Sequence, residues 1–170
     1  LRYSSMSKLT PHQASGGSPR VILFFATGFG VGYFPRLPGT AGTLLAVPLS
    51  LGLNAIAAIS LPIALLTLAA AICCAIWLST RAALILEQRD SSVIVIDEIV
   101  GFMIANFIAP RNVMLLGGAF LLFRFFDIAK VYPLSRLEKL PGGAGIVLDD
   151  VMAGLYVFGI LRLVHSWGLS

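Results

Sequence analysis

The chain has 170 residues, of which 58% are hydrophobic and only 12% are charged, and its mean hydropathy is +0.92. Soluble domains usually have about 45 to 50% apolar residues, so this composition predicts an integral membrane protein, in which helices satisfy the backbone polar groups. The formal net charge of +4 does not indicate nucleic-acid binding, because the basic residues neither cluster on one polar helix nor interleave with aromatic side chains.

Residues 1–20 are polar and rich in Ser, Gly and Pro, and we expect them to form a mobile tail. The remaining residues, 21–170, are predicted to form a single membrane domain. Arg2, Lys8 and Arg20 give the tail a positive charge, which favours the cytoplasmic side of the membrane by the positive-inside rule.

The segment 27–43, TGFGVGYFPRLPGTAGT, follows a short apolar run at 21–26 and is predicted to be a shaped loop, with a turn at Pro38-Gly39. A glycine-rich loop that leads into a helix offers backbone N–H groups and a positive dipole end to an anion, so Gly39 and Thr40 are candidate phosphate-binding residues. A plain turn into a membrane helix explains the same residues. Neither the dinucleotide-binding fingerprint nor the Walker pattern is present.

The predicted fold is an all-α membrane bundle of about five short spans. No residue from Leu37 to Thr80 is charged, and about 20 residues cross the hydrocarbon core once, so two spans fit in that stretch. The five predicted spans are 44–59, 62–78, 93–109, 113–126 and 151–164. If the tail is cytoplasmic, five crossings bring the start of the first, third and fifth spans and the end of the fourth to the same inner face.

Most of the acidic residues lie at these inner ends, next to apolar sequence. Asp97 and Glu98 are adjacent at the start of the third span, and intramembrane carboxylates are functional by default, although a helix N-cap would also explain them. Residues 123–154 hold a second concentration of charge. There, Arg124, Asp127 and Lys130 follow one another at intervals of three and so share a helix face.

Five carboxylates with two cations suit Mg²⁺ beside a phosphate group, because Mg²⁺ prefers oxygen ligands and cations hold phosphoryl oxygens. The carboxylates are Asp97, Glu98, Asp127, Asp149 and Asp150, and the cations are Arg124 and Lys130. Zinc is disfavoured, since the two histidines are His12 in the tail and His165 at the far end of the last span. The remaining chemistry is a metal-polarised phosphate attacked by water or by an aspartate.

Other classes of membrane protein are possible. An ion or proton transporter also carries intramembrane carboxylates, but it places them near the midplane on broken helices, whereas these lie at helix ends beside cations. A CDP-alcohol phosphotransferase would share Mg²⁺ and aspartates, yet its Asp-Gly-x-x-Ala-Arg signature is absent from the sequence. A purely structural membrane protein would not need five carboxylates at one depth.

Four segments of the chain resemble the motifs of the phosphatidylglycerophosphatase A family of membrane lipid phosphatases. They are LPGTAGT at 37–43, VIDEIVGFMIA at 95–105, FRFFDIAK at 123–130 and GGAGIVLDDVMAG at 142–154. The sequence departs from the family pattern after Lys130: the family usually reads Lys-Pro-x-Pro, whereas this chain has Lys130-Val131-Tyr132-Pro133.

The resemblance implies Mg²⁺-dependent hydrolysis of phosphatidylglycerophosphate to phosphatidylglycerol and phosphate, at the inner face of the bacterial cytoplasmic membrane. With this chemistry, we expect catalytic roles for Asp97, Asp127, Asp149 and Asp150, and phosphate binding by Gly39, Thr40, Arg124 and Lys130. The candidate metal ligands are Asp97, Glu98, Asp149 and Asp150. Which of these carboxylates bind the metal, and whether one acts as the nucleophile, stays open at this point.

Overall fold

The computed structural model describes residues 18–88, 91–109, 112–129, 132, 134–137 and 140–167. Every regular element within these residues is helical, which confirms the predicted all-α fold. The elements are α1 (Pro19–Ala26), the 3₁₀ turn η3 (Val31–Tyr33), α2 (Pro38–Ile59), α3 (Leu61–Ile85), α4 (Ile96–Ala105), α5 (Val113–Ala129), α6 (Leu134–Leu137) and α7 (Gly143–Ser166). The predicted tail lies outside the described residues up to residue 17, and α1 already begins at Pro19.

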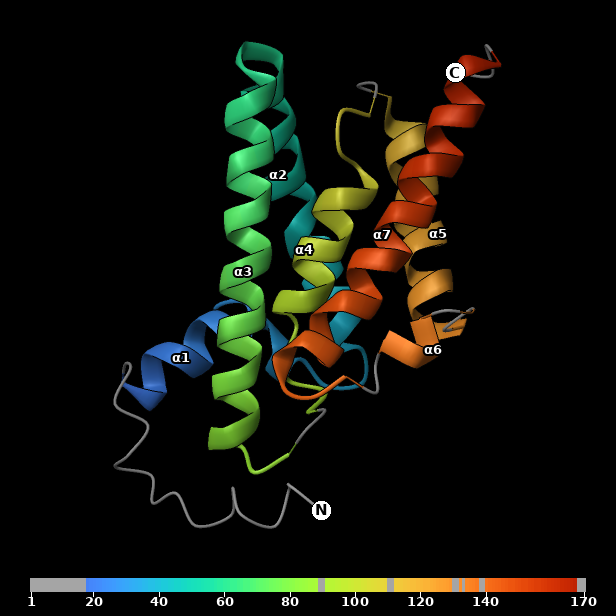
Figure 1. The fold of residues 1–170 in the computed structure, drawn as a ribbon. Helices are drawn as coiled ribbons and strands as arrows, with labels where there is room; N and C mark the ends of the chain where they lie inside the picture. Colours follow the sequence, from blue (N-terminus) through green and yellow to red (C-terminus); the bar gives the residue numbers. More distant parts are fainter. Residues whose placement is uncertain are drawn as a thin grey trace.

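The long helices form one bundle (Figure 1), in which α2 and α3 are an antiparallel pair and α7 packs against α3, α4 and α5. The side chains of Phe102, Phe123 and Val157 are fully buried where α4, α5 and α7 meet. The starts of α2, α4 and α7 and the end of α5 point toward the same end of the bundle, whereas α7 finishes at the opposite end. The order of the helices therefore gathers the charged motifs at one end.

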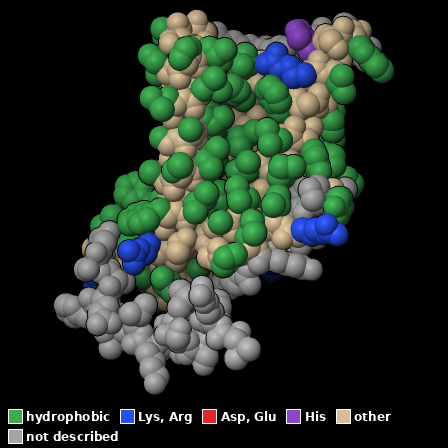
Figure 2. Space-filling view, viewed as in Figure 1, with side chains coloured by type: hydrophobic (Ala, Val, Ile, Leu, Met, Phe, Trp, Pro, Cys, Tyr) green, Lys and Arg blue, Asp and Glu red, His purple; other side chains and the backbone are tan. Residues whose placement is uncertain are grey.

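Three helices, α2, α3 and α7, are long and apolar enough to cross a membrane. The prediction of about five spans holds only in part, because α4 has ten residues and extends over about 15 Å, half of the roughly 30 Å hydrocarbon core. Helix α5, with 17 residues, lies at the lower limit for a span. Figure 2 shows apolar side chains over the middle of one face and cations only near its two ends, as expected for a surface in contact with lipid.

After α4, residues 106–109 are not helical and run toward the end of the bundle where α5 begins (Figure 1). Side chains of α2 hold this segment: Asn54 Nδ2 donates to the carbonyl of Asn106 over 2.8 Å, and Ile108 N donates to Asn54 Oδ1 over 2.7 Å. Asn106 Nδ2 in turn donates to Ser50 Oγ over 2.9 Å. Irregular backbone at membrane depth is tolerated where protein satisfies its polar groups, which is the case here.

Two helices begin earlier than the sequence predicts. Helix α2 starts at Pro38 and not at residue 44, so Gly39 and Thr40 lie in its first turn. Helix α7 starts at Gly143 and not at residue 151, so the glycines at 143 and 145 lie in its first turn. Gly143 lies against the backbone of α3, where a Cβ atom would overlap the carbonyl of Ile76, and Gly143 N donates to Thr80 Oγ1 over 2.9 Å. This tertiary contact outweighs the low helix propensity of glycine.

Glycines also allow α4 and α7 to touch backbone to backbone. A Cβ atom on Gly154 would overlap the carbonyl of Gly101, and one on Gly101 would lie 2.7 Å from the carbonyl of Asp150. Small residues at helix crossings permit such close approach in membrane bundles. The crossing fixes the distance between α4, which carries Asp97 and Glu98, and α7, which carries Asp150.

Candidate metal and phosphate site

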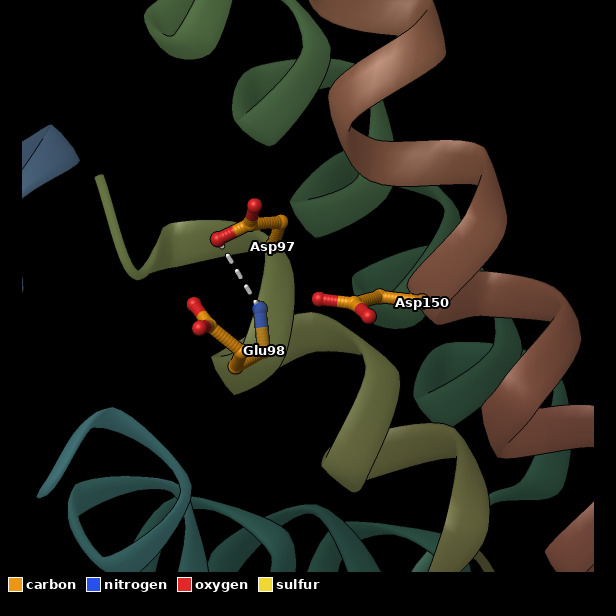
Figure 3. Close-up of side chains that lie close together, drawn as sticks. All are labelled: Asp97, Glu98 and Asp150. Atoms are coloured by element: carbon orange, nitrogen blue, oxygen red, sulfur yellow. Dashed lines mark hydrogen bonds between the residues drawn. The ribbon is translucent and has the colours of Figure 1, made fainter. Parts of the chain in front are cut away.

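Three carboxylates from two helices point toward one another (Figure 3). Asp97 and Glu98 lie in the first turn of α4, and Asp150 faces them from the second turn of α7. One oxygen from each of the three residues lies within 4.8 Å of the others, a spacing that could hold a metal ion. Asp97 Oδ1 also accepts the N–H of Glu98 over 3.0 Å, a local bond that orients the Asp97 carboxylate.

These carboxylates are too buried to share a small volume as free anions. The exposed fraction is 8% for Asp97 and 4% for Asp150, and Glu98 Oε2 has no hydrogen-bond partner among the described residues although it is buried. Burial removes the water that would solvate these charges, and at this spacing the carboxylates repel one another. Such a group takes up either protons or a cation, and a hard divalent ion with oxygen ligands fits this donor set.

A cation lies beside the carboxylates. The Arg124 guanidinium on α5 forms an ion pair with Asp127, with Nη1 2.6 Å from Oδ2, and Nη1 is 3.9 Å from Glu98 Oε1. Arg124 Nε is buried and has no hydrogen-bond partner in the described part of the chain. An arginine that is oriented by one carboxylate and keeps unused donors is suited to hold phosphoryl oxygens next to a metal.

The first turn of α2 completes the site. A Cβ atom on Gly39 would overlap Glu98 Oε1 and would lie 3.0 Å from Arg124 Nη1, so glycine is what allows the α2 backbone to approach these groups. The first backbone bond of α2 runs from Ala41 N to the carbonyl of Leu37, and the N–H groups of Gly39 and Thr40 precede it. The positive end of α2 therefore adjoins Arg124 and Glu98, an arrangement that favours an anion.

The other predicted site residues have different outcomes. Asp149 is buried on α7 and its Oδ1 accepts the N–H of Asp150 over 3.1 Å, but it is not one of the three carboxylates that converge. It interacts electrostatically with Asp97. Asp127 lies near enough to Glu98 and Asp150 to interact with both. Lys130, the remaining predicted phosphate ligand, lies outside the described residues.

Sequence reasoning missed the contacts that position α4. Val95 N donates to the carbonyl of Ala26 at the end of α1 over 3.0 Å, and a Cβ atom on Gly42 would lie 2.7 Å from Val95 Cβ. The two residues after Val95 and Ile96 are the paired carboxylates, so α1 and α2 together fix where α4 begins. The sequence feature that could have indicated these contacts is the set of glycines at 28, 30, 32, 39 and 42. A single sequence does not reveal which residues pack against them.

The sequence profile of the family described as phosphatidylglycerophosphatase A matches residues 24–165, which is most of the chain and includes all four motifs. The chain belongs to this family. The family is one of lipid phosphatases, so the membership argues against the transporter interpretation.

Three relatives support the assignment to this family. A putative phosphatidylinositol-3-phosphatase of Bacteroides thetaiotaomicron is 39% identical over 153 residues, covering 85% of this chain and 93% of the relative. The phosphatidylglycerophosphatase A of Escherichia coli is 33% identical over 150 residues (85% and 84%). That of Haemophilus influenzae is 33% identical over 150 residues (87% and 91%). No solved structure matches the chain.

Proposed function

We propose that this family member hydrolyses phosphatidylglycerophosphate to phosphatidylglycerol and phosphate, and that the reaction requires Mg²⁺. The observation that supports the proposal is that a metal half-site (Asp97, Glu98 and Asp150) lies next to a phosphate half-site (Arg124). Asp97, Glu98 and Asp150 can hold a divalent cation, and Arg124 stands 3.9 Å from Glu98 with a buried donor to spare. A phosphomonoester is the kind of ligand that binds a metal and an arginine at once.

Each group of site residues has a separate proposed role in the reaction. Arg124, aligned by Asp127, and the first N–H groups of α2 bind the nonbridging phosphoryl oxygens and stabilise the charge that develops there. Asp97, Glu98 and Asp150 hold Mg²⁺, which when bound polarises the phosphoryl group. Asp149 is next to this set and is proposed to act on the attacking group, either water or an aspartate. We keep Lys130 as a further phosphate ligand on sequence grounds.

The fold supports a topology in which the chain traverses the membrane five times, with α4 and the segment after it making one pass together. The site would then lie at the cytoplasmic face of a bacterial inner membrane, as the basic N-terminal residues favour. The product phosphate would leave into the cytoplasm, and the lipid would stay in the bilayer.

The B. thetaiotaomicron relative gives a second candidate substrate, since its name refers to a phosphoinositide phosphatase and its identity to this chain is 39%. Both substrates are lipid phosphomonoesters, so the metal and arginine half-sites suit either. They differ in the alcohol, which is a glycerol in one and an inositol ring in the other.

The experiment that tests the proposal is phosphate release by the purified full chain in mixed micelles. Phosphatidylglycerophosphate and phosphatidylinositol 3-phosphate are offered separately, with Mg²⁺, with EDTA, and with EDTA followed by excess Mg²⁺. We expect release from phosphatidylglycerophosphate that EDTA abolishes and Mg²⁺ restores. Full turnover in EDTA would contradict the metal requirement, and a preference for the inositol lipid would replace the substrate but leave the chemistry intact.

A further inference from the structure

The segment 19–37, which comprises α1, η3 and the turns around them, has an aromatic surface that none of the described helices covers. The surface is made of exposed rings and one aliphatic side chain: Phe24, Phe25, Phe29, Tyr33, Phe34 and Leu37. The exposed fraction reaches 59% at Tyr33, Phe34 and Leu37. Three of the rings, those of Phe24, Phe25 and Phe29, pack edge to face with centroids 5.2 to 5.7 Å apart, which gives the surface a fixed shape.

The backbone holds part of this surface in an unfavourable conformation. Phe29 has φ of 61° and Arg36 has φ of 80°, in the left-handed region that residues other than glycine seldom adopt. The hydrogen bond from Phe29 N to the carbonyl of Phe24, 2.8 Å long, helps to hold this turn. Strained backbone conformations cluster at binding sites, so the strained and exposed Phe29 indicates a surface that contacts a partner.

The charge around the aromatic surface identifies the partner. Arg20 and Arg36 are exposed at its two ends, and no Asp or Glu occurs anywhere in residues 1–86. Aromatic rings are enriched at the boundary between headgroups and acyl chains, where flanking cations meet anionic lipids. A protein partner is disfavoured because an exposed, mostly apolar surface beside membrane-spanning helices would first meet lipid.

The length and direction of α1 match this environment. Its eight residues extend over about 12 Å, too short to cross a bilayer, and the helix runs obliquely beside the lower part of α3 (Figure 1). Its other face is buried through Ile22 and Ala26, and the carbonyl of Ala26 accepts the N–H of Val95. The element thus joins the membrane boundary to the residue that precedes α4.

We propose that residues 19–37 are an in-plane anchor whose aromatic surface sits in the headgroup and acyl boundary of an anionic leaflet. The membrane contact of the anchor does not depend on the proposed phosphatase activity, whereas its effect on the site rests on that proposal. Through Val95 it sets the depth of Asp97 and Glu98 relative to the bilayer surface, so that a lipid headgroup reaches them while its acyl chains remain in the membrane.

The test uses the full chain in vesicles of phosphatidylglycerol and phosphatidylcholine, with Trp77→Phe and Trp167→Phe as the background. One reporter, Phe24→Trp or Phe29→Trp, is added, and the phosphatidylcholine carries bromine either near the glycerol or near the methyl end of its chains. We expect a larger loss of fluorescence with the shallow bromines. The matched control is Cys73→Trp in the same background, an exposed position at the middle of α3, where the deep bromines should quench more.

Each other result counts against the anchor. Stronger quenching of both reporters by the deep bromines would place the segment in the hydrocarbon core, and no quenching would mean that water or protein covers the surface. Crosslinking between chains would then reveal a second copy. The role of the basic side chains is tested separately. Replacing phosphatidylglycerol by phosphatidylcholine, or combining Arg20→Gln with Arg36→Gln, should reduce quenching by the shallow bromines. Unchanged quenching would contradict an anionic lipid partner. Two reporter positions are used in case one variant fails to fold, and neither readout requires enzyme activity.

Discussion

Asp149 and Asp150 are adjacent in the sequence but have different surroundings, because an α-helix turns by about 100° per residue. Asp150 faces Asp97 and Glu98, whereas Asp149 orients its neighbour by accepting the N–H of Asp150. The same geometry operates on α4, where Asp97 accepts the N–H of Glu98. In both pairs one carboxylate therefore restrains the backbone that carries the other.

Substitutions in the metal half-site and in the phosphate half-site should change different kinetic parameters. Asp150→Asn keeps the shape of the side chain but removes a negative ligand, so its residual activity should require a much higher Mg²⁺ concentration. Arg124→Ala removes a donor to the phosphoryl oxygens, which typically costs about 2.7 to 4 kcal/mol or roughly 10²- to 10³-fold in rate, with little change in the Mg²⁺ requirement. A Mg²⁺ titration of each folded variant measures both. Wild-type Mg²⁺ dependence in Asp150→Asn would remove this residue from the metal site.

Asp127 and Arg124 form one unit if the carboxylate acts by aligning the guanidinium. Asp127→Asn and Arg124→Ala should then be non-additive, since Asp127→Asn will cost little once Arg124 is absent. The measurement is kcat/KM for the two single variants and the double variant. Full additivity would show that Asp127 meets the reacting groups directly, as a catalytic residue in its own right.

At the scale of elements, the first turn of α2 is sensitive to a single methyl group. Gly39→Ala would push Glu98 and Arg124 away from the helix N-terminus, and misplacing catalytic groups by about 1 Å can cost on the order of 10²-fold in rate. Gly52→Ala is the matched control on the same helix, because its new Cβ meets no atom within 4 Å. We expect kcat to fall only in Gly39→Ala. Equal activities of the two variants would show that the approach of α2 to Glu98 is not needed.

The non-helical segment after α4 depends on Asn54. Asn54→Ala removes both hydrogen bonds to this segment, the one that Asn54 donates to the Asn106 carbonyl and the one that it accepts from the Ile108 N–H, and each such bond contributes about 0.5–1.5 kcal/mol. We expect a lower midpoint of thermal unfolding in detergent. Thr67→Ala serves as the control, because Thr67 is exposed and donates within its own helix. A shift no larger than that of the control would mean that lipid or detergent already competes for these groups.

The sequence predicted the helical class and the grouping of Asp97, Glu98, Arg124 and Asp150, because counting crossings requires only hydropathy and the positions of charges. It did not predict the start of α7 at Gly143, where contact with α3 decides the local structure, nor the short α4, whose apolar run continues past the end of the helix. Local propensity favours a loop at the glycines and a span at 93–109. Tertiary contacts, which one sequence does not show, override both.

For the whole molecule, the proposed topology places α6 and the end of α7 on opposite sides of the membrane. In a background lacking Cys73 and Cys74, Arg136→Cys should react with an impermeant thiol reagent only from the cytoplasmic side. Ser166→Cys should react only from the outer side. Labelling of both residues from one side would mean that α7 does not cross the membrane between them. The shared face of the carboxylates would then need another explanation.

The backbone contact between α4 and α7 has a consequence for the choice of cation. Because the helices already touch at Gly101 and Gly154, main-chain contacts fix how far apart the backbones that carry Asp97, Glu98 and Asp150 lie. Mg²⁺ binds oxygen at about 2.0–2.1 Å, whereas Ca²⁺ needs about 2.3–2.6 Å and more ligands. The helix crossing therefore selects the smaller cation, and Ca²⁺ should support little turnover. Gly101→Ala, which forces α4 and α7 apart, should reduce the difference between the activities measured with Mg²⁺ and with Ca²⁺.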